Sequence, residues 1–347
     1  MANQIDVMRR PFLSRVAPGL TLMVLAPLIA ELLPGATRLS SAFVFPIEVV
    51  IWGGGALVAR ELACRRSLGW VGLVALALAL SMAEECLIQQ TSFAPLVVKI
   101  QGVEYARAFG VNYVYLLWAL LYESLFVVVI PVGLAHLLFA CRARDPWLSR
   151  AGAVIIALLF MPACFAAWYG WNQIARVKVF HLAPYYLPTH LAVAGVVAIA
   201  LLIGTALVVG PKWSARFAKP LPPPHPALLF LLAATVPVAI FALEVLAFGI
   251  APTVPPAAAV ALAAIIAAAL LLVPRCRAAP TWRVGHEFAA LYGATLANFA
   301  VTFVGFGNNP LDLYGKIVLD VVATLLLLAF WWRRRAISAG PAVALRS

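Results

Sequence analysis

Long apolar stretches, separated by short polar or basic connections, run along the whole chain. A transmembrane helix needs about 20 mostly apolar residues, because each residue adds about 1.5 Å and the hydrocarbon core is about 30 Å thick. Ten stretches meet this requirement, at 17–34, 42–63, 68–90, 111–139, 151–171, 190–210, 226–248, 255–274, 287–306 and 313–332. They show no strand-like alternation. The pattern predicts an all-α, polytopic integral membrane protein with about ten transmembrane helices.

Composition and charge agree with this class of protein. Hydrophobic residues occupy 65% of the 347 positions and charged residues 11%, so lipid must surround much of the surface. The net charge of +12 comes from basic residues that gather in alternate connections, as the positive-inside rule describes. This distribution predicts that the N-terminus and the C-terminus are both cytoplasmic. The protein is expected in the cell inner (plasma) membrane. It argues against a nucleic-acid partner and makes the lipid bilayer the main partner.

The whole chain, 1–347, is predicted to be a single membrane domain. A proline-rich connection at 211–226 separates helices one to six (1–210) from helices seven to ten and the basic tail (227–347). Its prolines favour an extended cytoplasmic linker.

Two substantial loops are predicted on the outer side. Residues 91–110 contain the amphipathic piece VVKIQGVEYARAF, which is typical of a short helix lying along the membrane interface. Residues 172–189 form the second loop. Within the second predicted helix, Gly53, Gly54 and Gly55 favour the close approach of another helix or a local break.

Charged residues inside the apolar stretches are the main functional signal. A charge in the hydrocarbon core costs about 2.5–3.5 kcal/mol on insertion scales, so such residues are rarely accidental. Counting along each helix at about 1.5 Å per residue places several of them at a similar depth, towards the outer side. They are Glu31, Glu48, Glu84, Glu85, Glu123, Glu244, Lys316 and Asp320. Their common depth predicts a shared, hydrated cavity that opens towards the periplasm.

Glu84, Glu85 and Glu123 are the strongest candidates for function. Two adjacent acids cannot both ionise cheaply in a poor solvent, so at least one should carry a proton or hold a cation. We therefore predict that these three residues couple protons or activate water. Polar and aromatic positions at similar depth are the predicted substrate-binding residues: Glu48, Gln89, Tyr115, Trp118, Tyr122, Asn298, Lys316 and Asp320.

Several of these residues also have a purely structural interpretation. Lys316 and Asp320 are four residues apart on one helix, a spacing that favours a self-neutralising pair. Glu31 and Glu244 lie close enough to the interface to be simply hydrated. The three aromatic residues of the fourth helix are also typical of packing and of an interfacial belt.

Six segments in about the first 150 residues carry a resemblance to known sequences. They are PLIAELLPG (Pro27–Gly35), GGGALVAREL (Gly53–Leu62), AEECLIQQTSFAP (Ala83–Pro95), GVNYVYLLWALLYES (Gly110–Ser124), IP (Ile130–Pro131) and DPWLSRAG (Asp145–Gly152). Together they resemble an uncharacterised family of bacterial multi-pass membrane proteins.

The paired acids Glu84–Glu85 are also similar to the EExxxR motif of the CPBP (Abi) intramembrane proteases, which have FxxxH and a further His. The chain departs from that pattern, because Gln89 stands where Arg is expected and Ile130 stands where His would follow Phe126. This partial resemblance implies an intramembrane enzyme in which a glutamate activates water.

The sequence leaves three functions open. Ten helices and an acidic outer cavity favour a transporter or solute-binding permease for a small polar or cationic solute. The alternative is a glutamate-dependent intramembrane hydrolase, with Glu84, Glu85, Glu123 and His181 as candidate ligands if it uses a metal. The third is a non-catalytic partner subunit of a membrane complex. No Ser-His, Cys-His, HExxH or P-loop arrangement is present in the sequence. The sequence does not determine the cofactor, the metal or the oligomeric state.

Overall fold

The computed structural model describes residues 12–97, 107–216, 219–249, 272–304, 307 and 309–339. Within these ranges the chain is predominantly helical. The described β structure is one hairpin, in which β1 (Arg107–Ala108) pairs antiparallel with β2 (Val111–Asn112). Six helices are long and apolar enough to cross a membrane. The all-α class is therefore confirmed. The number of ten spans and the cytoplasmic location of both termini stay predictions.

Three helical runs form the centre of the bundle. The first consists of η2 (Leu39–Val44), α3 (Phe45–Glu48), η3 (Val49–Gly53) and α4 (Gly54–Arg65). The second consists of α5 (Gly69–Ala83) and η4 (Glu84–Ile88), and the third of α6 (Tyr113–Glu123), η6 (Ser124–Val129) and α7 (Ile130–Leu138). In each run, between 50% and 61% of the most apolar 18-residue segment is buried inside the protein.

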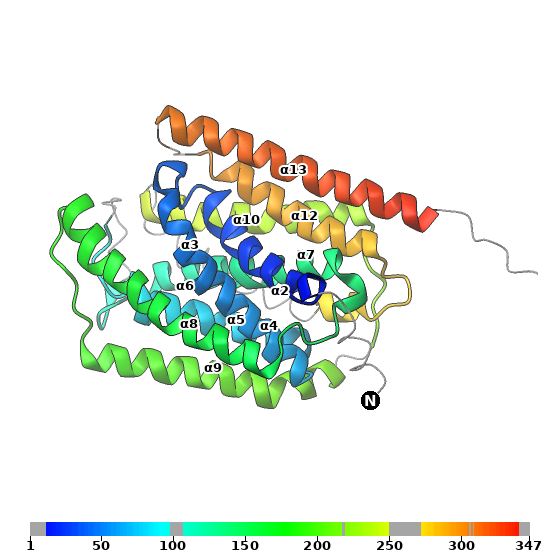
Figure 1. Ribbon diagram of the computed structural model, residues 1–347, viewed down its shortest axis with the longest axis horizontal. Helices are drawn as coiled ribbons and strands as arrows, with labels where there is room; N and C mark the ends of the chain where they lie inside the picture. The colour runs from blue at the N-terminus through cyan, green and yellow to red at the C-terminus, as the bar shows by residue number, and fades with distance from the viewer. Residues whose placement is uncertain are drawn as a thin grey trace, which may run out of the picture.

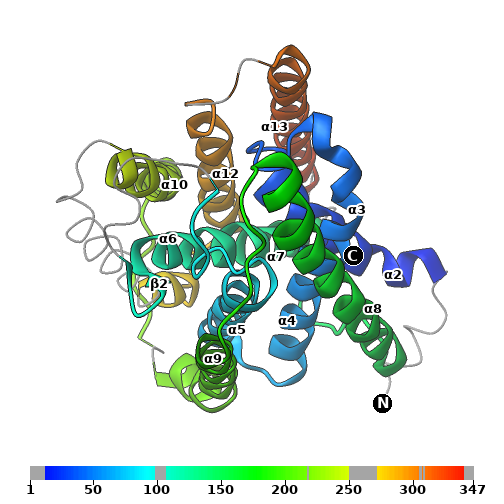
Figure 2. The same ribbon diagram turned by 90° about the vertical axis from the view of Figure 1, so that its left-hand side faces the viewer.

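Three further long helices lie at the periphery. They are α8 (Arg150–Tyr169) with its continuation η8 (Gly170–Val179), α9 (Thr189–Arg216) and α13 (Pro310–Ala339). Only 0% to 11% of their apolar windows is buried. Figures 1 and 2 show α9 and α13 on opposite edges of the bundle. Their exposed side chains include Leu158, Leu201 and Leu325, which suits helices whose solvent is lipid.

The remaining described helices complete the bundle. They are α2 (Phe12–Pro27) with η1 (Leu28–Leu32), α10 (Pro226–Gly249), α12 (Val284–Val301) and the short η7 (Ala140–Arg142). α10 and α12 pack along each other, and a Cβ at Gly293 would lie 2.4 Å from the carbonyl oxygen of Phe230. Most of the predicted eighth span, at 255–274, lies outside the described residues.

Gly53 brings the first helical run into close contact with α2. A Cβ at this position would lie 2.0 Å from the carbonyl oxygen of Met23, a distance that no real side chain can adopt. The prediction of a close helix approach at Gly53 is therefore confirmed. The contact places η3 against α2, which continues directly into η1.

Three connections differ from the predictions. α9 continues through Pro211 to Arg216, so the linker predicted to begin at residue 211 is too long; transmembrane helices tolerate an internal proline. η8 runs to Val179, so the first half of the loop predicted at 172–189 is helical. The predicted interfacial helix falls largely on 98–106, outside the described residues, and the Arg107–Ala108 part of that segment forms a strand.

A buried arginine explains why η8 extends so far. The guanidinium of Arg176 donates to the carbonyl oxygens of Pro95, at 2.8 Å, and Ala183, at 3.3 Å. The N–H of Leu182 donates to the carbonyl of Arg176 at 2.8 Å. These bonds tie the end of the helix to both neighbouring loops, and hydrophobicity alone does not reveal them.

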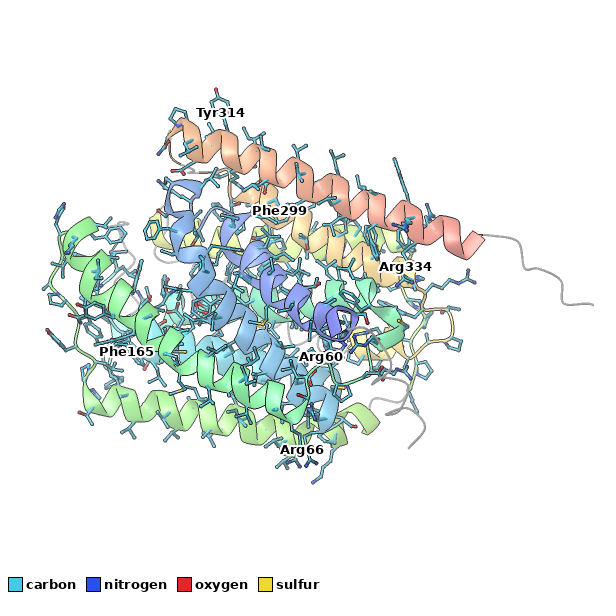
Figure 3. All side chains as sticks on the ribbon, viewed as in Figure 1. Arg60, Arg66, Phe165, Phe299, Tyr314 and Arg334 are labelled. Carbon is cyan, nitrogen blue, oxygen red and sulfur yellow. The ribbon has the colours of Figure 1, made fainter. Side chains whose placement is uncertain are left out.

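Basic residues gather towards one end of the bundle. In Figure 3, Arg60, Arg66 and Arg334 lie to the right of Phe165 and Tyr314 along the long axis of the molecule. We refer to the end that carries these arginines as the arginine end and to the other as the opposite end. Their separation is of the kind that the positive-inside rule describes.

Candidate functional site: a buried glutamate cluster

Three of the predicted acids meet inside the bundle. Glu84 and Glu85 begin η4, and Glu123 ends α6. These residues are 2%, 2% and 8% exposed, and the carboxyl group of Glu123 lies within hydrogen-bonding reach of the other two carboxyl groups. The structure therefore places acids from two separate spans in one site.

Two further acids join this site. Glu31 lies in η1, and Glu48 is the last residue of α3. The carboxyl group of Glu31 is close enough to those of Glu48, Glu84 and Glu85 for electrostatic repulsion. Glu31 therefore joins the other acids that the sequence predicted at a similar depth, and its side chain is half-buried. We call Glu31, Glu48, Glu84, Glu85 and Glu123 the glutamate cluster.

Neutral hydroxyl groups hold two of the carboxyl groups. The Ser81 hydroxyl donates to Oε2 of Glu123 at 2.7 Å, and the Ser92 hydroxyl donates to Oε2 of Glu85 at 2.8 Å. Ser81 lies four residues before Glu85 on the third predicted helix, a spacing that places both on one face. Ser92 was not singled out, because it follows η4 in a loop, where helical periodicity gives no signal.

Two more carboxyl groups of the cluster, those of Glu48 and Glu84, each have one oxygen bonded and one oxygen without a partner. Thr37 Oγ1 donates to Glu48 Oε1 at 2.5 Å, and Gln89 Nε2 donates weakly to Glu84 Oε1 at 3.4 Å. The second oxygens, Oε2 of Glu48 and Oε2 of Glu84, are buried and have no hydrogen-bond partner in the protein. A buried polar atom without a partner carries a desolvation cost of about 1–3 kcal/mol.

No cation of the described chain neutralises the cluster. The described ion pairs of Lys and Arg involve Glu61, Glu287 and Asp320, and none involves a member of the glutamate cluster. Several carboxylates in contact in a water-poor interior cannot all be ionised, because their mutual repulsion adds to the cost of burial. The cluster must therefore share protons or bind an added cation.

The helices change their winding where they carry these acids. Glu31 lies within the π-helical segment η1, Glu84 and Glu85 begin the π-helical η4, and Glu48 and Glu123 directly precede the π-helical η3 and η6. At the end of η4, the N–H of Gln89 donates to the carbonyl of Glu84, five residues earlier, at 2.7 Å. Such π-helical turns are rare and occur frequently at functional sites.

Asn172 supports the end of η4 from a neighbouring helix. Its side-chain amide, fully buried in η8, donates to the carbonyl oxygens of Gln89 at 3.0 Å and Ile88 at 3.3 Å. These carbonyls come after the π-helical turn and lack the partners of a continuous helix. Sequence reasoning missed Asn172 because the residue was placed in a loop.

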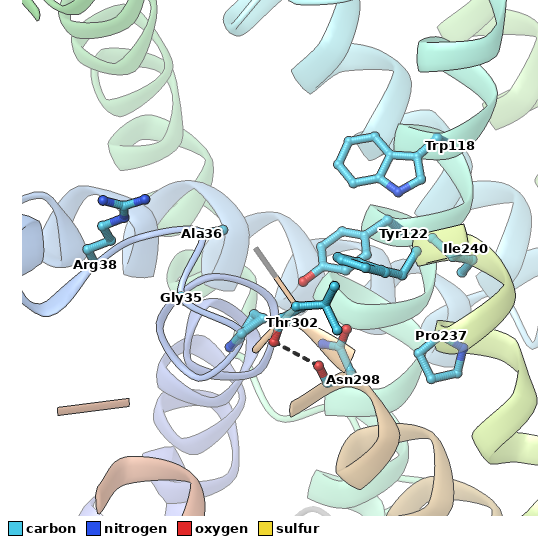
Figure 4. Close-up of a pocket in the computed structure, with 12 residues that line it drawn as sticks. Gly35, Ala36, Arg38, Trp118, Tyr122, Pro237, Ile240, Asn298 and Thr302 are labelled. Carbon is cyan, nitrogen blue, oxygen red and sulfur yellow. Dashed lines mark hydrogen bonds between the residues drawn. The ribbon is translucent and has the colours of Figure 1, made fainter. Parts of the chain in front are cut away.

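A cavity of about 250 Å³ lies next to the cluster, since Tyr122 lines it and Glu123 follows Tyr122 in the chain. Three predicted substrate-binding residues, Trp118, Tyr122 and Asn298, line it together with Arg38 and Thr302 (Figure 4). None of the five clustered glutamates is among the lining residues. The acids and the cavity are therefore neighbours, whereas the sequence predicted an acidic cavity wall.

The polar groups of the cavity wall are mainly hydrogen-bond donors. The indole nitrogen of Trp118 and Nδ2 of Asn298 are buried and have no partner within the protein. The Tyr122 hydroxyl is engaged, since it donates to the carbonyl oxygen of Ala30 at 2.7 Å. Two unpaired donors favour a ligand that brings acceptor oxygens.

An aromatic ladder joins the cavity to the cluster. The rings of Trp118 and Tyr122 stack with centroids 5.6 Å apart, and Tyr122 is the chain neighbour of Glu123. Through its bond to Ala30, Tyr122 also contacts the residue next to Glu31. Tyr115 packs on Trp118 at 5.2 Å but is not among the residues that line the cavity.

Lys316 and Asp320 have a structural arrangement. Nζ of Lys316 contacts Oδ2 of Asp320 at 2.7 Å and also donates to the carbonyls of Leu33, at 2.6 Å, and Phe299, at 3.2 Å. The pair thus joins α13 to α12 and to the end of η1. It does not line the cavity, and its contacts fit the self-neutralising pair better than substrate binding. The side chain of Glu244 lies outside the described residues.

Within the described residues, no group of three or more His, Cys, Asp and Glu side chains is arranged to hold a metal ion. The proposed ligand set of three glutamates and His181 therefore has no support in the geometry. Comparisons with protein-family models, with curated proteins and with solved structures gave no match to this chain.

Proposed function

We propose that the chain is a multi-pass transporter or solute-binding permease of the bacterial inner membrane, in which the glutamate cluster exchanges protons. The observation that supports this proposal is the gathering of five carboxyl groups, with Glu84, Glu85 and Glu123 buried and no ion pair from any of the five to a described Lys or Arg. Intramembrane acids of this kind are typical of proton relays in pumps and transporters. Since the described acids lack a metal-binding arrangement, a proton is the ion that the cluster accommodates best.

The solute binds in the neighbouring cavity. The unpaired donors of Trp118 and Asn298, together with Arg38, favour a small polar solute that carries acceptor oxygens, such as a carboxylate. A cationic solute, which the acids alone suggested, would find no carboxylate in the lining of this cavity. The volume of about 250 Å³ restricts the solute to a small molecule.

Coupling follows from the shared elements of the two sites. Tyr122 lines the cavity and stands beside Glu123, and its hydroxyl is bonded next to Glu31. Protonation of the cluster relieves repulsion between η1, η4 and α6, and solute binding acts on the same helices through Tyr122. The π-helical turns at the acids are the points where these helices can change direction most easily.

Proton-driven uptake into proteoliposomes tests the proposal. A pH gradient is applied, and internal pH is followed with a trapped dye while small carboxylates and amino acids are supplied one at a time. We expect one of them to produce proton uptake that Glu85→Gln reduces at least tenfold. Asp145→Asn, which also converts an acid into its amide but lies at the arginine end, should leave uptake unchanged.

Other results select another function. A metal that copurifies with the wild-type chain and is lost in Glu85→Gln would favour the intramembrane enzyme, in which Glu84 or Glu85 activates water. Absence of uptake with every solute, together with no bound metal, would leave the partner subunit as the better proposal. Equal uptake by wild type and Glu85→Gln would remove the cluster from the mechanism.

A further inference from the structure

A second and larger cavity, of about 570 Å³, lies at the arginine end of the bundle. One part of its wall is apolar and comes from α5, η6, α7 and α12, through Leu73, Val129, Val132 and Leu291. The other part is basic and aromatic. The cavity therefore has an apolar side and a polar side.

Arg60 forms a fixed part of the wall. It is 2% exposed, its Nη1 contacts Oε1 of Glu61 at 2.7 Å, and its Nη2 donates to the carbonyl of Ala143 at 2.8 Å. Its guanidinium also stacks on Trp147, 3.7 Å from the ring centre. These contacts satisfy the guanidinium, so Arg60 shapes the cavity and is not available to bind a ligand strongly.

Two other arginines line the cavity, together with Glu287. Arg144 is exposed, and its guanidinium has no partner among the described residues. Arg277 is 39% exposed at its side chain and shares its charge with Glu287, 3.1 Å away. Guanidinium groups bind phosphate oxygens through paired N–H donors, so this rim suits a phosphate group.

An unpaired donor on the same wall also indicates a ligand. The indole nitrogen of Trp70 is buried, has no hydrogen-bond partner in the protein, and belongs to a residue that lines the cavity. Arg277 lies over the ring of Trp70, 5.9 Å from its centre. A buried N–H without an acceptor is costly, and an oxygen of a ligand would satisfy it.

We infer that this cavity binds an anionic phospholipid, with the phosphate group between Arg144, Arg277 and Trp70 and one acyl chain along the apolar wall. A molecule that carries both hydrocarbon and anionic oxygen matches both parts of the wall, which are continuous in one cavity. Basic pockets between transmembrane helices at the cytoplasmic side are known to bind anionic lipid headgroups. The site is separate from the glutamate cluster and does not depend on the proposed transport activity.

Native mass spectrometry of the full-length protein in detergent tests this inference. Phosphatidylglycerol and phosphatidylcholine with identical acyl chains are titrated separately, and the fraction of lipid-bound protein is measured. We expect phosphatidylglycerol to bind at least fivefold more tightly. Arg144→Gln should abolish most of this preference, and Trp70→Phe, which keeps the ring and removes the N–H, should weaken phosphatidylglycerol binding severalfold.

Arg66→Gln is the matched control. Arg66 is exposed at the same end of the bundle but does not line the cavity, so its removal should leave lipid binding unchanged. Because the guanidinium of Arg144 has no partner among the described residues, its variant should fold normally, which a thermal unfolding curve checks. Equal binding of the two lipids, or equal losses in Arg66→Gln and Arg144→Gln, would overturn the inference. Displacement of the lipid by millimolar inorganic phosphate would show a phosphate site without a role for the acyl chain, and would overturn the lipid assignment.

Discussion

The Lys316–Asp320 pair and the glutamate cluster are two buried charged groups, but they differ in the partners that they have. Lys316 is surrounded by one carboxylate and two carbonyl oxygens, so its charge is balanced where it stands. The glutamate cluster has five acids, and the hydrogen-bond donors described for it outside the cluster are all neutral. The comparison shows that burial of a charge does not by itself indicate function. An unbalanced set of like charges does, because the fold alone gains nothing from assembling it.

Removing one member of the balanced pair should have the largest effect on stability. Lys316→Met leaves Asp320 buried without a cation, and loss of one partner of a buried pair typically costs about 3–5 kcal/mol. Unfolding in mixed detergent micelles measures this loss. The double variant Lys316→Met, Asp320→Leu should recover most of the stability, since it removes both charges. A double variant as unstable as the single one would show that the carbonyl contacts of Lys316 matter more than its charge.

Separating the helices that carry the cluster should have an intermediate effect. Gly53→Ala places a methyl group against the Met23 carbonyl and pushes η3 away from α2, at a cost of about 1–3 kcal/mol for overpacking. It should also reduce proton-driven uptake, because Glu31 lies in the continuation of α2 and Glu48 directly precedes η3. Gly204→Ala in α9 is the control, since a Cβ there meets nothing within 4 Å. Equal stability of the two variants would contradict the close contact.

Neutralising one acid of the cluster should have the smallest effect on stability. Glu123→Gln removes a negative charge from an unbalanced site and keeps an oxygen that can accept from Ser81, so the free energy of unfolding should change by less than about 1 kcal/mol. Asp320→Asn makes the same chemical change in the balanced pair and should cost clearly more. If the two amide variants lose the same stability, the distinction between the two groups is wrong.

Much of the fold could be predicted from the sequence. The apolar stretches predict helices, and all of the predicted spans that fall on described residues are helical, because a run of about 20 apolar residues has few other stable structures in lipid. The positions of helix ends in loops were less predictable. η8 continues to Val179 because Arg176 bonds to carbonyls of two other segments, and such long-range contacts leave no local pattern.

The candidate site was predictable only in part. Residue counts along the helices predicted that Glu84, Glu85 and Glu123 have a similar depth, and the structure places them together. The same counts include Glu31, for which hydration at the interface is the alternative interpretation, whereas no sequence pattern indicates Ser92 or Asn172. All three reach the site through a π-helical turn, a loop or a neighbouring helix, so their direction cannot be calculated from the period of a regular α-helix.

The sequence by itself determined the all-α class and the long apolar helices, and it predicted a similar depth for the acids, because these depend on hydrophobicity and on a constant rise per residue. Only the tertiary structure decided which acids share a site, that Asp320 neutralises Lys316, and that hydrogen-bond donors line the adjacent cavity. The physical reason is that the direction of a side chain depends on helix winding and on the position of neighbouring helices. Both are set by contacts between residues that are far apart in the chain.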